Sequence, residues 1–426
     1  MKVLVVGSGG REHALAWKIS QSPHVTHIFV APGNGGTEIE NNIINIDIKA
    51  SDIKGLLAFA KSNEVDMTIV GPEDPLVKGI TNRFEEENLM CFGPTKEAAQ
   101  LEGSKEFMKV FLEKYSIPSA EYKAFTNAKE AINYIKKKGC PIVIKADGLA
   151  AGKGVTIAKN MNEAIEAIHD SMNSQIFGDA GKKVVIEEFL SGEEASFIVM
   201  TDGKTALPFA SSQDHKARDD GDLGPNTGGM GAYSPAPIVD KEIHEKIMNT
   251  VIYPTLAGLE KEGLKYIGFL YAGLMIDKNK NLKVLEFNCR FGDPETQPIM
   301  MRLKSDLAQL CYDACRESLQ NSELEWDDRK SLGVVMASKG YPHEYESNQD
   351  IQNLPKSEND LKIFHAGTKI ENGKLKSNGG RVLCVTALGS TVHSAQEKAY
   401  NAISKISWKD SYFRRDIGHR AINRED

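Results

Sequence analysis

The sequence lacks a long hydrophobic segment and a basic region. No apolar run approaches the roughly 18 residues that a membrane-spanning helix needs. The amino-terminal KVLVV runs directly into a glycine turn, which is unlike a cleaved signal peptide. The net charge is −7, and no stripe of lysine or arginine stands out. We therefore expect a cytoplasmic protein that binds neither membranes nor nucleic acids.

Cysteine is also scarce. The six cysteines are scattered, and their spacing is not that of a secreted disulfide framework. Cys311 and Cys315 lie four residues apart in a helical pattern and so share a helix face, but no second pair stands at metal-ligand spacing. We expect buried thiols of the core rather than a metal site.

Two common nucleotide-binding signatures are missing. No GxxxxGK[ST] segment is present, so the chain has no P-loop. The turn GSGGREH, Gly7 to His13, departs from the dinucleotide fingerprint because Glu12 stands where the third glycine belongs. The next expected strand ends in Ala31-Pro32, without an acidic residue for a ribose. A nicotinamide-dependent dehydrogenase is therefore disfavoured, although the turn can still bind an anion.

The first hundred residues alternate short apolar runs with helical patterns. Strands are expected at KVLVV, HIFVA, NIDI, MTIV and MCF, and helices from Arg11, over 52–62 and over 76–88. This alternation predicts an open parallel α/β sheet of four or five strands. The turns at the carboxyl ends of such strands hold ligands.

The pattern changes after residue 103. Helices are expected over 104–115, 127–138, 161–173, 240–262 and 297–318, and strands at VVIEEF, FIVM, TALPFA, YIGFLYAGLMI and LKVLEFNCRF. Residues 214–237 are rich in glycine and proline, and we expect a long functional loop there rather than regular structure. The strands LGVVMAS and RVLCVTAL and a helix near 392–405 predict a third, small α/β unit.

The most informative segment is PIVIKADGLAAGKGVT. An apolar run ends at Lys145, a turn with Gly148, Gly152 and Gly154 follows, and then comes another β-prone run. The pattern predicts a β-hairpin whose tip closes over a polyphosphate, because glycine has no Cβ to keep backbone amides away from oxygen atoms. A plain surface hairpin is the alternative.

A second constellation stands at the end of the strand LKVLEFNCRF. Residues two apart share a face, so Glu286, Asn288 and Arg290 project together while Phe287 and Cys289 face the core. A carboxylate and an amide oxygen suit Mg²⁺, and an arginine adds an anion clamp. A solvated strand edge is the alternative.

The strand VVIEEF carries a weaker signal of nucleotide binding. The backbone around Glu187 could hold an adenine edge, Phe189 could cover its face, and Glu194 could bind ribose hydroxyls. Acidic strand ends are common, so this segment gains weight only beside the others.

Together these segments resemble the ATP-grasp superfamily of carboxylate–amine ligases and, within it, the glycinamide ribonucleotide synthetase family. The resemblance is carried by LEGSK, KADGLAAGKGV, EEFLSGEEAS, DHKARDDGDLGPNTGGMGAYSPAP, EFNCRFGDPETQ and FRRDIG, which span Leu101 to Gly418. The turns GSGGREH and APGN fit as well. Ala217 is a departure, since the family more often has a basic residue there.

The resemblance implies an architecture and a reaction. It implies an amino-terminal open parallel α/β domain (1–102), a central ATP-grasp domain (103–325) with a mobile lid subdomain (118–190), and a small carboxyl-terminal α/β domain (326–426). It also implies ATP with Mg²⁺ or Mn²⁺, glycine and 5-phosphoribosylamine as substrates, and a glycyl phosphate intermediate. We expect a monomer because no long apolar helix face is left over.

The resemblance further implies roles for the matched residues. The residues expected to bind ATP are Lys105, Lys145, Gly148, Gly152, Gly154, Glu187, Phe189 and Glu194. The residues expected to bind the metal ion are Glu286 and Asn288. The residues expected to contact glycine and phosphoribosylamine are Gly9, Gly10, Asn34, Asp214, His215, Lys216, Asp293 and Arg290. The expected catalytic residues are Lys145, Arg290 and Asp293. Whether His215 moves a proton or only positions others, and whether Arg414 and Arg415 reach adenine or merely pack, stays open.

Two further interpretations stay open. Another ATP-grasp enzyme, such as a carboxylase subunit that phosphorylates bicarbonate, would explain the hairpin and the ExNxR strand but not residues 214–237. A non-catalytic nucleotide sensor would keep the adenine residues and lose the metal pair, yet Glu286 and Asn288 are both present.

Overall fold

The computed structural model describes residues 1–149, 154–173 and 181–425. Its first hundred residues form a parallel sheet of five strands in the order β3-β2-β1-β4-β5. The strands are β1 (Lys2–Gly7), β2 (His27–Pro32), β3 (Ile43–Asn45), β4 (Met67–Val70) and β5 (Cys91–Phe92). The predicted open parallel sheet is confirmed.

Four helices accompany this sheet, namely α1 (Gly10–Ile19), α2 (Ile53–Ser62), α3 (Glu73–Val77) and α4 (Ile80–Glu86). The single helix expected over 76–88 is wrong, because Gly79 has a φ of +90° between α3 and α4. That left-handed conformation interrupts a helix and favours glycine.

The central part contains two antiparallel sheets of four strands each, with the orders β11-β10-β16-β17 and β6-β9-β7-β8. Their strands are β6 (Tyr122–Phe125), β7 (Ile142–Ala146), β8 (Val155–Ala158), β9 (Val184–Glu188), β10 (Glu193–Thr201), β11 (Ala206–Pro208), β16 (Gly268–Ile276) and β17 (Leu282–Asn288). The helices are α5 (Gln100–Gly103), α6 (Lys105–Lys114), α7 (Ala128–Lys138), α8 (Met161–Asn173), α9 (Lys241–Ile247), α10 (Tyr253–Lys261), α11 (Thr296–Arg302) and α12 (Leu307–Cys315). The predicted hairpin around Lys145 is confirmed as β7 and β8.

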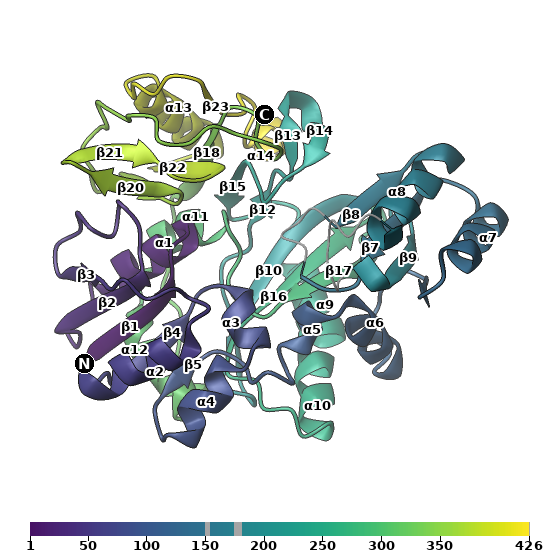
Figure 1. Cartoon of the computed structure of the whole chain (residues 1–426), viewed down its shortest axis with the longest axis horizontal. Coiled ribbons are helices and arrows are strands. Elements are labelled where there is room, and N and C mark those ends of the chain that lie inside the picture. The colour runs from purple at the N-terminus through teal and green to yellow at the C-terminus, as the bar shows by residue number, and fades with distance from the viewer. Residues whose placement is uncertain (150–153, 174–180, 426) are drawn as a thin grey trace.

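The sheet β6-β9-β7-β8 and the helices α7 and α8 form a lobe that projects from the body of the molecule (Figure 1). This lobe has a hydrophobic core of its own, which includes Phe125, Ile135, Ile144 and Ile168. A lobe with a separate core is suited to move as a unit. The lid boundaries 118–190 stay a prediction.

Two long helices expected from the sequence are modified. The helix over 240–262 contains a π-helical segment, Met248–Ile252, between α9 and α10. The helix expected over 297–318 is two helices, because the backbone turns extended at Leu303 and Asp306 caps the start of α12 by accepting from Ala308 N and Gln309 N.

The carboxyl-terminal sheet runs in the order β12-β15-β18-β22-β19, with β23 paired to β18. Its strands are β12 (Gln213–Asp214), β15 (Gly231–Ser234), β18 (Lys330–Ser338), β19 (Leu361–His365), β22 (Arg381–Gly389) and β23 (Ser411–Tyr412). The hairpin β20 (Thr368–Glu371) and β21 (Lys374–Ser377) and the helices α13 (Val392–Ile403) and α14 (His419–Glu425) complete this part. Two of these strands, β12 and β15, come from the central region. The sheet thus extends across the domain boundary that was expected at residue 325.

Residues 214–237 are more regular than expected. They contain β15 and a separate hairpin of β13 (Ala217–Asp219) and β14 (Leu223–Asn226), joined by a 3-10 turn over Asp220–Asp222. The prediction of an irregular loop was wrong there because β15 pairs with β18, a strand about a hundred residues away. Local glycine content does not reveal such a partner.

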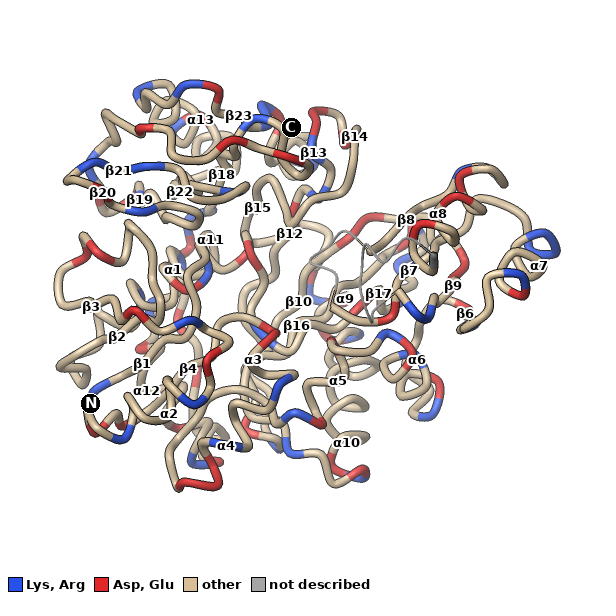
Figure 2. The backbone as a smooth tube through the Cα atoms, in the orientation of Figure 1, with Lys and Arg blue, Asp and Glu red and all other residues tan. Residues whose placement is uncertain are grey.

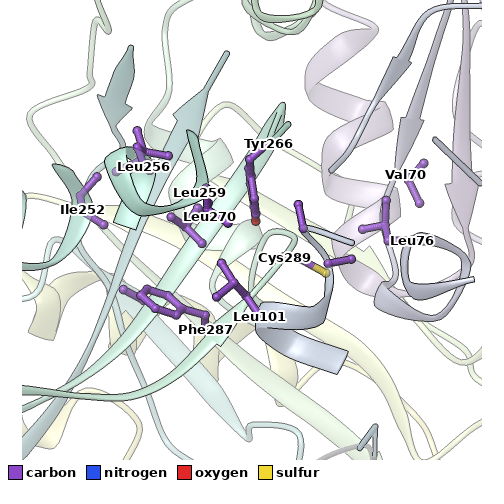
Figure 3. Packing of buried hydrophobic residues seen from close by; sticks show 14 of the residues in the cluster. Val70, Leu76, Leu101, Ile252, Leu256, Leu259, Tyr266, Leu270, Phe287 and Cys289 are labelled. Carbon is purple, nitrogen blue, oxygen red and sulfur yellow. The ribbon is translucent and has the colours of Figure 1, made fainter. Parts of the chain in front are cut away.

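One hydrophobic cluster joins the amino-terminal domain to the central domain (Figure 3). Val70 and Leu76 come from the first domain, Leu101 from α5, and Phe287 and Cys289 from the end of β17 and just beyond it. Phe287 and Cys289 are each 1% exposed, so the predicted inward face of this strand is confirmed. The packing holds the neighbouring polar face of β17 against the domain junction.

Basic and acidic residues are mixed over the surface elements (Figure 2). Among the described residues, no helix is long and apolar enough to cross a bilayer. All six cysteines are free, and Cys311 is buried while Cys315 is partly buried. The described part of the chain holds no cluster of three or more His, Cys, Asp or Glu side chains that would bind a metal by themselves.

Candidate active site

A cavity of about 490 Å³ lies where the three parts of the chain meet. Its walls come from the start of α1, from α5 and α6, from the hairpin β7–β8, from β9, β16 and β17, and from the start of β22. A concave pocket with several converging charged groups is the usual form of a ligand site. Thirteen of the residues singled out in the sequence line it: Lys105, Lys145, Gly148, Gly154, Glu187, Phe189, Glu194, Asp214, Lys216, Glu286, Asn288, Arg290 and Asp293. Gly152 lies outside the described residues.

Lys145 is held in a defined position at the cavity wall. Its Nζ lies 2.9 Å from Glu187 Oε1 and donates to the backbone oxygen of Leu285 at 3.0 Å. Leu285 is the extra residue of a β-bulge in β17, which interrupts the regular pairing with β16. Glu187 is 2% exposed and also pairs with Lys109 at 2.9 Å. The Glu187 carboxylate is therefore committed to two lysines.

The predicted metal pair has uncommitted oxygen atoms. Glu286 and Asn288 both face the cavity, and within the described ranges neither side chain makes a hydrogen bond. Burial alone would raise the pKa of Glu286, but Lys216, Lys145 and other cations lower it to about 2. A permanent carboxylate beside an amide fits Mg²⁺ or Mn²⁺, whose remaining positions are normally taken by water and by substrate phosphates.

Lys216 joins two acidic residues on the same side of the cavity. Its Nζ lies 2.9 Å from Glu194 Oε2 and 3.6 Å from Glu286 Oε1. Although burial opposes the charged form, Glu194 and Glu286 keep the pKa of Lys216 well above its usual value. For the nearby Asp214, burial raises the pKa to about 8 despite the attraction of Lys216.

Arg290 is clamped between two carboxylates. Its Nε donates to Glu73 Oε2 at 3.0 Å, and its Nη2 lies 2.8 Å from Glu102 Oε1. Burial would raise the pKa of Glu73, but Arg290 and Arg11 lower it to about 2. The amino-terminal domain, through Glu73, thus orients an arginine of the central domain. The turn VGPEDPL after the fourth strand had indicated Glu73 as a residue of the crevice, whereas Glu102 was missed, although LEGSK contains it.

Arg381 enters the cavity wall from β22 of the carboxyl-terminal sheet. Its Nη1 donates to the backbone oxygens of Gly228 at 2.6 Å and Asp293 at 2.7 Å. Asp293 also accepts from Arg11 N at 3.4 Å and from Gln297 Nε2 at 3.0 Å. Arg11 was not singled out, although it stands in the turn GSGGREH, and Arg381 was missed because no local pattern around it indicates a cavity.

Gly9, Gly10 and Asn34 do not line the cavity. Gly9 N donates to Glu12 Oε2 at 2.6 Å, so the amide that would meet a dinucleotide phosphate is already occupied. Asn34 Nδ2 donates to the backbone oxygens of Ser8 at 2.8 Å and His365 at 2.9 Å. The expected substrate contacts of these three residues stay predictions, and the segment after β1 reaches the cavity through Arg11 of α1.

His215 also lies outside the cavity. It is 0% exposed, and its Nε2 accepts from Gly418 N at 3.0 Å, while its Nδ1 lies 3.7 Å from Asp222 Oδ1. Neighbouring residues of an extended chain point to opposite sides, so His215 faces away while Asp214 and Lys216 face the cavity. Burial lowers the pKa of His215 to about 4, so it is neutral at physiological pH. These contacts favour a positioning role for His215, and its expected substrate contact stays a prediction.

Comparison with known proteins covers the whole chain. Family models for the N domain, the ATP-grasp domain and the C domain of phosphoribosylglycinamide synthetase match residues 1–102, 103–296 and 331–420. Proteins named phosphoribosylamine–glycine ligase from Escherichia coli K12 and Haemophilus influenzae are 58% and 57% identical, each over 100% of this chain and at least 99% of their own length.

Solved structures agree with these matches. The phosphoribosylamine–glycine ligase of Thermotoga maritima superposes with a TM-score of 0.85 at 35% identity, over 98% of this chain and 100% of that one. A biotin carboxylase of Campylobacter jejuni, solved as a β-γ-ATP complex, has a TM-score of 0.77 at 15% identity over 97% of this chain and 92% of its own, a likeness of fold alone. The expected ATP-grasp fold is confirmed, and the chain belongs to the phosphoribosylglycinamide synthetase family.

Proposed function

We propose that this protein is an ATP-dependent ligase of purine biosynthesis that joins glycine to 5-phospho-D-ribosylamine. The products are glycinamide ribonucleotide, ADP and phosphate. The expected cytoplasmic location and monomeric state stay predictions.

One observation carries the proposal. Lys145, from the lid hairpin, and Glu286 and Asn288, from β17, line the same cavity. A triphosphate needs both cations and a metal at the same place, and these three residues supply them. The full-length identity to proteins named phosphoribosylamine–glycine ligase supports this choice of substrates.

The reaction needs no nucleophilic side chain. The carboxylate of glycine attacks the γ-phosphorus of ATP, and ADP leaves, which gives glycyl phosphate. The amine of 5-phosphoribosylamine then attacks the acyl carbon, phosphate leaves, and the nitrogen loses a proton as the amide forms. The protein therefore acts mainly by orientation, by placing charges, and by excluding water from the acyl phosphate.

The cavity offers two groups of cations for two phosphorylated substrates. Lys105 and Lys145 lie beside the lid hairpin, and Lys105 Nζ donates to Gly148 O at 2.8 Å. We assign this group to the phosphates of ATP, with the adenosine near Phe189 and Glu194. Glu187 then acts by orienting Lys145. A divalent cation held by Glu286 and Asn288 would neutralise phosphate charge during the transfer.

The second group consists of Arg11, Arg290 and Arg381, which line the same cavity as Asp293. Arg11 and Arg381 contact Asp293 directly. Arginine suits carboxylates and phosphates because its planar fork forms paired hydrogen bonds. We assign this group to glycine and the ribose phosphate, together with Asp214 and Lys216.

Omission of single substrates tests the proposed function. With ATP and Mg²⁺, phosphate release should be fast only when glycine and 5-phosphoribosylamine are both present. It should fall to background when the amine, glycine or the metal is left out. A parallel reaction with bicarbonate in place of glycine tests the carboxylase alternative. Phosphate release that depends on bicarbonate, and not on glycine, would contradict the proposal.

Arg381→Met should lower kcat/KM for 5-phosphoribosylamine about tenfold, which corresponds to one charge-assisted hydrogen bond. The variant loses the link between Gly228 and Asp293. Nucleotide affinity should change little, because Arg381 lies in the group away from the lid. Lys374→Met is a suitable control, since this lysine is largely exposed in the same domain. Equal losses of affinity for ATP and for the amine would contradict the assignment.

A further inference from the structure

The hairpin β13–β14 is an isolated element at the surface. Its strands pair only with each other in the described sheets, and Leu223 at its turn is 66% exposed. A two-stranded hairpin with no hydrophobic face is only marginally stable in water. Other parts of the chain must therefore hold it in place.

Both ends of this hairpin lead into the cavity. Lys216 directly precedes β13, and Asn226, Thr227 and Gly228 close and follow β14. Thr227 donates to Lys216 O twice, from its amide at 2.8 Å and from its hydroxyl at 2.9 Å. The position of the hairpin therefore sets the position of two stretches of the cavity wall.

The carboxyl-terminal segment 412–420 lies against this hairpin, and Figure 1 shows the end of the chain beside β13 and β14. Four hydrogen bonds link the two, three of them from hydroxyl and backbone groups of the segment and one accepted by the carboxylate of Asp416. The bonds are Tyr412 Oη to Arg218 O and Asp219 Oδ1, both 3.0 Å, Arg415 N to Asp220 Oδ1 at 2.8 Å, and Gly221 N to Asp416 Oδ2 at 2.8 Å.

Arg414 is the centre of these contacts. It is 0% exposed, and its Nη1 donates to Ala217 O at 3.1 Å and to Asp222 Oδ1 at 3.0 Å. Its Nε and Nη2 each donate to Asp416 at 2.8 Å, which fixes the guanidinium plane. Arg420 Nη2 donates to the other oxygen of Asp222 at 2.6 Å. Hydrogen bonds between charged groups are stronger than those between neutral groups.

Few other groups hold the turn. Within the described ranges, the hydrogen bonds and ion pairs that reach residues 217–222 from outside the hairpin come from His215 and from residues 412–420. Arg414 does not line the cavity. The hydrogen bonds of its Nη1 go to the hairpin instead.

We propose that Arg414 is a positioning residue for the acceptor side of the active site. Through Ala217 and Asp222 it holds the hairpin so that Lys216 and Thr227 keep their places in the cavity wall. The substrate affected is the phosphorylated amine, and this part of the inference rests on the proposed function. Arg415, by contrast, is exposed, and its side chain makes no hydrogen bond or ion pair with the part of the chain that the structure describes.

The test compares Arg414→Met with Arg415→Met in the full-length protein. Hydrogen exchange of a peptide covering residues 214–230 should become about tenfold faster in Arg414→Met, because charged hydrogen bonds to the hairpin are lost. The KM for 5-phosphoribosylamine should rise about tenfold, while the affinity for ATP stays within about twofold of the wild type. Arg415→Met should match the wild type in all three measurements.

Asp222→Asn removes the same link from the hairpin side, outside the carboxyl-terminal core, and decides the matter if Arg414→Met fails to fold. Unchanged exchange and unchanged KM in a folded variant would overturn the proposal. So would equal losses of affinity for ATP and the amine, which would show a general disturbance. The exchange measurement needs no substrate, so it stays informative even if the wild type shows no glycine-dependent phosphate release.

Discussion

Glu286→Ala is expected to abolish turnover that depends on Mg²⁺, with a loss of at least about a thousandfold in kcat, because a metal supplies several kcal/mol of charge stabilisation to phosphoryl transfer. Glu286 provides a permanent carboxylate among several cations, and Asn288 alone cannot replace its charge. The measurement is phosphate release over a series of Mg²⁺ and Mn²⁺ concentrations.

The fold should survive this substitution. Glu286 is not part of the hydrophobic core, and Lys216 keeps its partner Glu194 at 2.9 Å. The variant should therefore unfold within a few degrees of the wild type. Asp277→Ala, in the turn before β17, serves as the control for loss of an acidic residue. Full activity of Glu286→Ala at low Mg²⁺ would show that the metal binds elsewhere.

The pKa of Glu286 adds a prediction about pH. Because its pKa is lowered to about 2, the carboxylate stays charged throughout the usual assay range. The apparent affinity for Mg²⁺ should therefore not fall between pH 8 and about pH 4 through protonation of this group, although an ordinary glutamate would be more than half protonated at that lower limit. A loss of metal affinity centred at the ordinary glutamate pKa, near about 4.3, would show that the surrounding lysines do not act on Glu286 as the geometry indicates.

Lys145→Ala should lower kcat/KM for ATP about a hundredfold, since a charge-assisted phosphate contact contributes about 2–3 kcal/mol. Lys145 pairs with Glu187 and donates to the backbone oxygen of the bulged Leu285, so its ammonium group is held at the cavity. Steady-state kinetics with varied ATP, together with direct nucleotide titration, measures the effect.

Two controls accompany Lys145→Ala. Lys159→Ala removes an exposed lysine just beyond β8 of the same hairpin and should leave kcat/KM unchanged. Thermal unfolding checks that Glu187, which keeps Lys109 as a partner, does not destabilise the lid lobe. A folded Lys145→Ala variant with wild-type activity would refute the role assigned to this hairpin.

Sequence periodicity predicted those features of the site that depend on one strand or one turn. The alternation in LKVLEFN places Glu286 and Asn288 on one face and Phe287 on the other, and the structure confirms this arrangement. The glycine-rich turn after Lys145, between two β-prone runs, likewise predicted the hairpin β7–β8 from local sequence alone. The same logic, applied to residues 214–216, would have separated His215 from Asp214 and Lys216.

By itself, the sequence determined the parallel amino-terminal sheet, the lid hairpin and the outward face of β17, because each follows from local periodicity and from glycine's freedom of φ. Only the tertiary structure decided that Glu73, Arg11 and Arg381 meet at Arg290 and Asp293. Those residues come from different parts of the chain, and Arg381 lies 88 positions from Asp293. Local patterns reveal which face of an element is buried, whereas the long-range packing that brings two such faces together leaves no local signal.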